Sequence, residues 1–335
     1  MDINLLMKLF HLPSPSYQEI LVQEFITKFL EERNIPFNVD DMGNIYNISN
    51  EGCVLMSAHM DTVQNDNDVK MAKFAKPRGS IIKGNGCLGA DDKNGLYIIL
   101  NLLDTGWKDK INFVFSVEEE VGGNGSEHFV SENGEAISKL PYGLILDRRG
   151  ANDIICINND YGTKEFEDEL IRLGWKFGYT PDIGTWSDAD KISNYISCAN
   201  LSVGYYNAHS RHEYVKIDEL ENASDYVKHI IDNIEGTFEK PNKYEFNGYS
   251  KYMGSFYPYD FDDYGNEIDP YATPSLAGNG VYKKCNCCYG MTSQTKFIKT
   301  LNMEVCNTCY YSLLEELTDD YEDFFLESLI NDKVM

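Results

Sequence analysis

Short apolar segments that each run into an acidic residue or a histidine constrain this chain more than any other feature of its sequence. These segments reach His59, Asp91, Glu120, Asp147 and His209. Helical patterns lie between them, for example over 17–34, from about 93 to 103, and over 218–235. Strands that alternate with helices predict an α/β fold, in which three layers place helices on both faces of a mixed sheet.

The composition divides the chain into three parts. Residues 1–236 carry the alternating pattern and predict one sizeable domain. Residues 237–280 are rich in Tyr, Asn, Asp and Gly and poor in aliphatic side chains, which is typical of a linker or a loosely ordered arm. Residues 281–335 hold a cysteine cluster and an acidic stretch with a helical pattern, and they predict a small separate module.

The charge of the chain disfavours one class of partner. The chain has 54 acidic and 29 basic side chains and a formal net charge of −25, so it repels the phosphates of nucleic acids. Residues 1–20 lack the basic start and continuous apolar run of a signal peptide, and no later stretch is apolar enough to span a membrane. We therefore expect a cytoplasmic protein that binds neither nucleic acid nor membrane.

The two histidines and three acids that follow the apolar segments form a candidate site for two metal ions. Zn²⁺ binds imidazole nitrogens and carboxylate oxygens readily, and Co²⁺ and Mn²⁺ accept the same ligands. Two ions that share one carboxylate need two further protein ligands each, and this set supplies them. Each piece also has a simpler explanation; for example, Asp91 or Asp92 can cap a helix. The order, the spacing and the positions at strand ends together favour the metal site.

Further carboxylates lie beside these residues. Asp61 follows His59 by two positions, and strand alternation places it on the same side, where it would accept the second imidazole N–H. Glu118 and Glu119 precede Glu120, and such a neighbouring carboxylate can act as the base for a metal-bound water. An acidic triplet is more often only a solvated charge run. The interpretation of one of these glutamates as a catalytic base therefore depends on the position of the triplet directly after a predicted strand.

Six motifs, in order along the chain, make it resemble the co-catalytic zinc exopeptidases, and within them the peptidase T-like aminopeptidases. The motifs are SAHMDTV (57–63), GADDKNG (89–95), EEEVGGNGSEHF (118–129), LILDRRG (144–150), GTWSDADKI (184–192) and GYYNAHSRHEYV (204–215). The resemblance covers almost all of 1–236 and implies that this part is a di-zinc catalytic domain. The GADDK and EEEVG sequences are its most specific parts.

The resemblance implies a ligand set. His59 and Asp147 would bind one zinc ion, Glu120 and His209 would bind the other, and Asp91 would bridge the two. The implied cofactors are therefore two catalytic Zn²⁺ ions, with Co²⁺ or Mn²⁺ as alternatives.

The resemblance also implies the residues that act around the ligands. Asp61 would orient its histidine, and Glu119 would take a proton from a metal-bridging water and return it to the leaving amine, which leaves the preceding glutamate without a role. His212 competes with His209 as a ligand. The family pattern places the ligand four residues before a glutamate, and His209 followed by Glu213 fits it.

The interval between Asp147 and His209 departs from the family. Peptidase T relatives carry an inserted lid and dimerisation domain there, and 147–209 is too short to hold one. Without a lid, residues near the ligands would have to recognise the ends of a substrate. Arg148, Arg211 and His212 are the candidates, because an arginine can pair with a substrate carboxylate. Simple charge balance is the alternative for the arginines.

A glycine run at 84–89, GNGCLG, matches the dinucleotide-binding pattern GxGxxG. It runs directly into Asp91, so a phosphate site here would require one turn to serve two chemistries. We therefore interpret the run as part of the predicted metal site.

The nine cysteines favour a second metal site over a disulfide scaffold. Four are scattered singly, and the others lie between 285 and 309. Two C-x2-C pairs, Cys285 with Cys288 and Cys306 with Cys309, have the spacing of a zinc ribbon and predict one structural Zn²⁺. The acidic stretch that follows favours a protein partner, or simple stabilisation, over nucleic acid as the role of this module.

These observations predict a zinc metallopeptidase, specifically an aminopeptidase that hydrolyses short peptides. A deacylase or a carboxypeptidase of the same clan is the alternative, because these enzymes share the metal site and differ in loops. An inactive hydrolase-like adaptor that binds protein partners is the alternative of another class. The presence of Glu119 and all five candidate ligands argues against the adaptor.

Overall fold

The computed structural model describes residues 1–241 and, beyond them, the backbone of short strands between 260 and 306. The chain divides into two compact units, Met1–Asn247 and Gly248–Met335. Cys285, Cys288 and Cys309 lie outside the described residues, and only the backbone of Cys306 is described. Among the described helices, none has the length and apolar character needed to cross a membrane.

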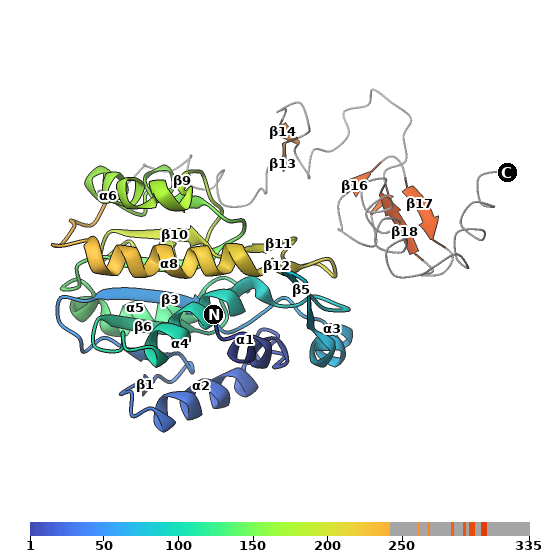
Figure 1. The fold of residues 1–335 in the computed structure, drawn as a ribbon, viewed down its shortest axis with the longest axis horizontal. Coiled ribbons are helices and arrows are strands. Elements are labelled where there is room, and N and C mark those ends of the chain that lie inside the picture. The colour runs from blue at the N-terminus through green and yellow to red at the C-terminus, as the bar shows by residue number, and fades with distance from the viewer. Residues whose placement is uncertain are drawn as a thin grey trace. The chain divides into compact units, whose positions relative to one another are not determined.

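An eight-stranded sheet forms the centre of the first unit, in the order β1-β2-β6-β3-β7-β10-β8-β9 (Figure 1). Its strands are β1 (Asn38–Val39), β2 (Ile45–Asn47), β3 (Val54–His59), β6 (Ile111–Ser116), β7 (Gly143–Arg148), β8 (Asp153–Ile155), β9 (Thr180–Pro181) and β10 (Cys198–Ser202). The four central strands β6, β3, β7 and β10 run parallel, and β2 and β8 join them antiparallel. The carboxyl ends of the parallel strands therefore meet at one edge.

Helices cover both faces of this sheet. The helices of the first unit are α1 (Ile3–Phe10), α2 (Ile20–Glu32), α3 (Asp66–Met71), α4 (Ala90–Asp104), α5 (Asn124–Ile137), α6 (Lys164–Gly174), α7 (Ala189–Ile192) and α8 (Ile217–Asn233), with single turns η1 (Ala72–Phe74), η2 (Ile157–Asn159) and η3 (Trp175–Phe177). Helices α4 and α8 lie across the same face (Figure 1) and share one hydrophobic cluster with α1, α2 and α6. Helices α5 and α7 contribute to a second cluster.

Alternation along the strands separates these two clusters. Met56 and Ala58 of β3 belong to the first cluster, whereas Leu55 between them belongs to the second. Leu144 and Ile145 of β7 divide in the same way. Because successive side chains point to opposite faces of a sheet, the two clusters are the two inner layers of a helix–sheet–helix sandwich. The predicted α/β fold is confirmed for this unit.

A second sheet of four strands follows the order β11-β12-β5-β4. It contains β4 (Lys76–Arg78), β5 (Ile81–Lys83), β11 (Tyr205–Tyr206) and β12 (Tyr214–Lys216). β11 and β12 are antiparallel neighbours, so the segment 207–213 is the turn between them. β5 pairs with β12 and precedes the loop that leads into α4. This sheet therefore brings the last predicted motif next to the GADDK motif.

Residues 147–209 form part of the main domain. Its strands β8, β9 and β10 all join the eight-stranded sheet, and α6 and α7 pack on it. The expectation that a separate lid domain has no room here agrees with this arrangement. The first unit also continues past Gly236, because the Phe238 ring packs against Tyr142 and Phe166.

The described strands of the second unit form three two-stranded ribbons. They pair β13 (Asp260–Phe261) with β14 (Glu267–Ile268), β15 (Lys283–Lys284) with β16 (Met291–Thr292), and β17 (Thr295–Ile298) with β18 (Met303–Cys306).

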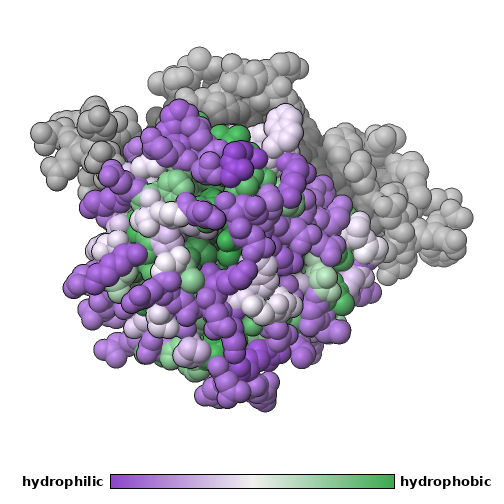
Figure 2. All heavy atoms as spheres, turned by 60° about the vertical axis from the view of Figure 1, so that its left-hand side comes forward, coloured by the Kyte–Doolittle hydropathy of each residue, from purple (hydrophilic) through white to green (hydrophobic). Residues whose placement is uncertain are grey.

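In the first unit, hydrophilic side chains cover most of the face that Figure 2 shows, with apolar residues visible between them.

Candidate active site

The predicted site residues gather at the carboxyl edge of the parallel strands. His59 is the last residue of β3, and Asp147 lies near the end of β7. The acidic run 118–120 follows β6, Asp91 lies at the start of α4, and His209 lies in the turn between β11 and β12. This edge is where the open sheets of α/β proteins bind ligands, because loops from neighbouring strands meet there.

The Asp91 carboxylate lies between the two histidines. Its Oδ1 atom is 3.1 Å from His59 Nε2, and its Oδ2 atom is 3.2 Å from His209 Nε2. Each carboxylate oxygen therefore faces a different imidazole. One carboxylate shared in this way is the geometry that a pair of metal ions requires of a bridging ligand.

Each histidine also faces a second acid. Asp147 Oδ1 is 3.5 Å from His59 Nε2, and Glu120 Oε1 is 2.9 Å from His209 Nε2. Glu120 Oε1 is buried and has no hydrogen-bond partner, so this close approach lacks hydrogen-bond geometry. A buried, unpartnered oxygen beside an imidazole nitrogen fits a site for a cation, because an ion between them would satisfy both.

The accessibility of the two histidines differs. The His59 side chain is 1% exposed, whereas that of His209 is 47% exposed. His209 also has a φ of 61°, in the left-handed region that non-glycine residues rarely adopt. The site is therefore closed on the β3 side and open to solvent on the side of the β11–β12 turn.

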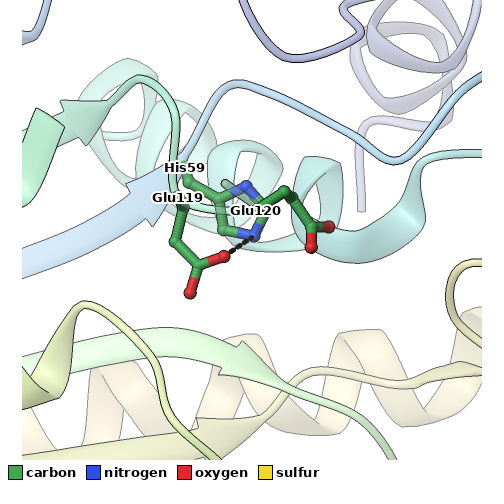
Figure 3. A group of neighbouring side chains, drawn as sticks. All are labelled: His59, Glu119 and Glu120. Atoms are coloured by element: carbon green, nitrogen blue, oxygen red, sulfur yellow. Dashed lines mark ion pairs between the residues drawn. The ribbon is translucent and has the colours of Figure 1, made fainter. Parts of the chain in front are cut away.

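Glu119 lies inside the site, next to the candidate ligands. Its Oε2 atom is 3.9 Å from His59 Nε2, and Figure 3 shows its carboxylate directed at the imidazole, with Glu120 beside it. Glu118, in contrast, turns outward and accepts a hydrogen bond of 2.9 Å from the Asn124 side chain. Of the acidic triplet, Glu119 and Glu120 thus contribute to the site and Glu118 does not.

Burial and mutual repulsion change the pKa values of these carboxyl groups. Burial and the neighbouring Asp91 raise the pKa of Asp147 to about 8. Burial likewise raises the pKa of Glu119 well above its ordinary value. Burial acts in the same direction on Asp91, but contacts with His209 and His59 outweigh it and hold the pKa of Asp91 below the usual range. Such crowding of buried acids fits a bound cation, which would favour their ionised forms.

Asp61 contacts His59 as expected and makes further contacts with the loop 119–120. The second nitrogen of His59, Nδ1, is 2.9 Å from the main-chain carbonyl of Asp61 and 3.4 Å from its carboxylate. The Asp61 carboxylate also accepts the N–H groups of Glu119, at 2.9 Å, and Glu120, at 3.1 Å, and the Ser16 hydroxyl at 2.8 Å. Both the carbonyl and the carboxylate of Asp61 therefore lie beside the imidazole of His59, and the carboxylate also binds the loop 119–120.

Sequence reasoning missed Asp92. Its carboxylate accepts the N–H of His59 at 3.2 Å and the N–H of Gly95 at 3.0 Å. The second contact is the helix cap that was the alternative for this pair of aspartates. Asp92 also lies near His59 and Asp147 in one of three groups of potential metal ligands among the described residues. In the sequence, Asp92 is visible only as the second member of the acidic pair 91–92. The pair alone does not distinguish a metal ligand from a residue that caps a helix.

The three residues predicted to contact the substrate come from two different segments of the chain. Arg148 is largely buried, pairs with Asp153 at 2.9 Å and also approaches Asp182 at 3.6 Å. These contacts agree with the charge-balancing alternative for Arg148. Arg211 and His212 lie in the same turn as His209, where Arg211 is exposed and His212 is half-buried. These two residues remain candidates for substrate contact.

One protein-family model and several solved structures are similar to the first unit of the chain. Residues 55–174 match the model of peptidase family M20/M25/M40. A similar solved structure is the aminopeptidase PepT from Bacillus cereus, with 18% identity, a TM-score of 0.57, and coverage of 69% of this chain and 97% of that chain. No curated protein sequence matches the chain.

Two further similar structures are also described as peptidases. A tripeptidase from Staphylococcus aureus has 17% identity and a TM-score of 0.55, over 68% of this chain and 96% of that chain. An aminopeptidase from the archaeon Desulfurococcus kamchatkensis has 17% identity and a TM-score of 0.56, over 70% of this chain and 95% of that chain. At such identities the likeness establishes the fold.

Proposed function

We propose that this chain, which carries a peptidase family M20/M25/M40 domain over residues 55–174, is a metal-dependent aminopeptidase that acts on short peptides. One observation carries the proposal. The two oxygens of the buried Asp91 carboxylate face His59 and His209 separately, and each histidine has a second acid beside it. This arrangement supports a co-catalytic pair of ions and has no evident use in packing.

The proposed ligands follow from the distances. His59 and Asp147 would hold one ion, His209 and Glu120 would hold the other, and Asp91, which faces both histidines, would contribute to both. Nitrogen and oxygen donors of this kind suit Zn²⁺, and Co²⁺ and Mn²⁺ as well. When bound, such ions polarise a scissile carbonyl and lower the pKa of water.

Glu119 is the proposed general base. Its carboxylate is buried among the ligands but makes no contact with His59 shorter than 3.9 Å, so Oε2 is available to a proton. A buried carboxylate beside the ligands suits a group that accepts a proton from water and then delivers it to the leaving amine. The backbone N–H of Glu119 is held by Asp61, which keeps this carboxylate in place.

The class of substrate that we propose follows from the side of the site that is open to solvent. Half-exposed His209 and its turn face solvent, and the interval 147–209 adds no separate domain above them. A short peptide can enter there, and residues of this unit would recognise its ends. The similar solved structures that are aminopeptidases or a tripeptidase support the choice of a peptide with a free N-terminus.

A panel of short peptides tests the proposal, with free, N-acetylated and C-amidated versions of each sequence. We expect cleavage that needs a free N-terminus, tolerates C-amidation and disappears with a chelator. Release of acetate from blocked substrates would indicate a deacylase, and a requirement for a free C-terminus would indicate a carboxypeptidase. Either outcome would overturn the aminopeptidase assignment.

The variant Glu119→Gln tests the base. Loss of a general base lowers kcat by about 10²–10⁴-fold. Glu118→Gln is the matched control, because it makes the same change one residue away on a carboxylate that points at Asn124. We expect kcat of this control to remain near that of the wild type. Equal activity of Glu119→Gln and the wild type would remove Glu119 from the mechanism.

A further inference from the structure

We infer that Glu213 is a positioning residue, which fixes the Asp91 carboxylate relative to His209 and thereby sets the affinity of the site for a pair of metal ions. The inference rests on the proposed function, since it assumes that these two residues bind metal. Glu213 itself belongs to none of the groups of potential metal ligands found among the described residues. Its role would be exerted through the backbone around Asp91.

The contacts of Glu213 are unusually concentrated on one loop. The residue is 1% exposed. Its Oε2 atom accepts the N–H of Gly89 at 2.6 Å and the thiol of Cys87 at 3.3 Å, and its Oε1 atom accepts the N–H of Asp91 at 3.1 Å. Three donors within the segment 87–91 therefore converge on a single carboxylate.

The position of Glu213 in the chain links two ligand-bearing segments. It ends the turn 207–213 that carries His209, and it directly precedes β12. The loop that it binds carries Asp91. One side chain thus ties the turn of the exposed histidine to the backbone of the residue whose carboxylate faces both histidines.

The loop has little freedom to take another path. Gly89 has a φ of 70°, and a Cβ atom there would approach Thr62 Cγ2 to 2.7 Å. The loop is therefore packed on one side against Thr62 and held on the other by Glu213. Without the carboxylate, the N–H groups of Gly89 and Asp91 would be left buried and unsatisfied, which favours movement of the loop.

The three donors of the loop need a side chain that offers a hydrogen-bond acceptor at both of its terminal positions. A carboxylate offers acceptors on both oxygens, whereas the glutamine amide replaces one oxygen with an N–H donor. In Glu213→Gln, that donor would face either the N–H of Asp91 or the donors of Gly89 and Cys87. The substitution thus keeps size and shape while it breaks the support of the Asp91 loop.

Titration of the full-length, metal-free protein with Mn²⁺ tests the inference. Mn²⁺ is the probe because carboxylates suit it, whereas cysteine clusters select softer ions. We expect the wild type to bind two Mn²⁺ ions and to give the EPR signal of a spin-coupled pair. We expect Glu213→Gln to lose about 10–100-fold in Mn²⁺ affinity and to lose the coupled signal, with a helical circular dichroism spectrum like that of the wild type.

Glu167→Gln is the matched control. Glu167 is also a buried glutamate, and its Oε1 atom accepts the N–H of Ile157 at 3.1 Å, outside the predicted site. We expect its Mn²⁺ affinity and coupled signal to match those of the wild type. An equal loss in this control would mean that any loosened buried glutamate weakens the site, and it would overturn the specific role of Glu213.

Glu213→Asp keeps the inference testable if Glu213→Gln does not fold. The shorter aspartate retains the charge but cannot reach both loop N–H groups, so a folded variant should bind Mn²⁺ more weakly than the wild type. Wild-type affinity in either folded variant would overturn the inference. Failure of the wild type itself to bind a pair of ions would instead contradict the proposed metal site.

Discussion

At the scale of single residues, the side chains beside the ligands do more of the positioning than the sequence motif suggests. The spacing of His59 and Asp61 predicts a carboxylate–imidazole contact, and Asp61 Oδ1 lies 3.4 Å from His59 Nδ1. The Asp61 carbonyl is nearer to that nitrogen, and the carboxylate also accepts the N–H groups of Glu119 and Glu120 in the loop 119–120. The reason is local: the backbone N–H groups of that loop lie within reach of the carboxylate. Spacing along a strand carries no information about a loop that arrives from another strand.

Asp61→Asn tests this positioning role. The amide keeps one acceptor but presents an N–H donor toward one of the two backbone N–H groups of the loop 119–120. We expect kcat to fall by about 10–100-fold while the protein still binds metal. Steady-state kinetics and metal analysis of the purified variant provide the measurement.

Ser16→Ala serves as the control for that variant, because it removes only the hydroxyl that donates to Asp61 and leaves the loop contacts intact. We expect a smaller loss of kcat in the control. If Asp61→Asn matched the wild type in kcat, the contacts of Asp61 with the loop would have no part in catalysis.

At the scale of elements, helix α4 connects the site to the core. The sequence predicts a helix from about residue 93, and the structure has α4 over Ala90–Asp104 with non-helical backbone at Asp91 and Asp92. Regular helix therefore begins after the acidic pair. Gly95 lets this end of α4 approach β7 closely, since a Cβ atom there would lie 2.4 Å from the carbonyl oxygen of Leu146.

Gly95→Ala is expected to push α4 away from β7. The added methyl group would also lie 2.6 Å from the Asp92 carboxylate, so the start of the helix would have to move. Overpacking of this kind lowers the free energy of unfolding by about 1–3 kcal/mol. Denaturant unfolding monitored by circular dichroism measures the change.

Gly84→Ala is the control for the helix variant, because its Cβ atom would have no neighbour closer than 3.5 Å. We expect its free energy of unfolding to stay close to that of the wild type. A Gly95→Ala protein as stable as this control would mean that α4 and β7 tolerate a wider separation.

At the scale of the whole molecule, the buried acids of the site belong to a chain whose formal net charge is −25. Burial and Asp91 raise the pKa of Asp147 to about 8 from 3.8, and burial raises the pKa of Glu213 to about 7 from 4.5. A carboxyl group whose pKa is raised on folding favours the folded state at low pH and loses that contribution as the pH rises through the folded value. The free energy of unfolding of the metal-free protein should therefore fall as the pH rises from about 4, where ordinary carboxyl groups ionise, to about 8, where Asp147 does.

The same reasoning predicts how metal changes the pH dependence. A bound cation favours the ionised carboxylates, so the metal-loaded protein should lose less stability over that range. Thermal unfolding with and without a chelator, at several pH values, measures both effects. Equal pH dependence of the two forms would show that no cation binds to these acids.

The sequence by itself determined the fold class of the first unit and the residues that could form its site. Short apolar runs and helical patterns depend only on local order, so they predict β3, β7, α4 and α8, and chemistry-bearing residue types at strand ends stand out against them. The acids and histidines named from the motifs are the residues that meet at the edge of the sheet.

Only the tertiary structure decided how these residues act on one another. It separated Asp91, whose oxygens face two histidines, from Asp92, which caps a helix, although the two are adjacent in sequence. It assigned Arg148 to Asp153 and joined Glu213 to the loop of Asp91. These outcomes depend on which loops meet at the sheet edge and on which donors are left buried there, and both are set by packing between segments far apart in the chain.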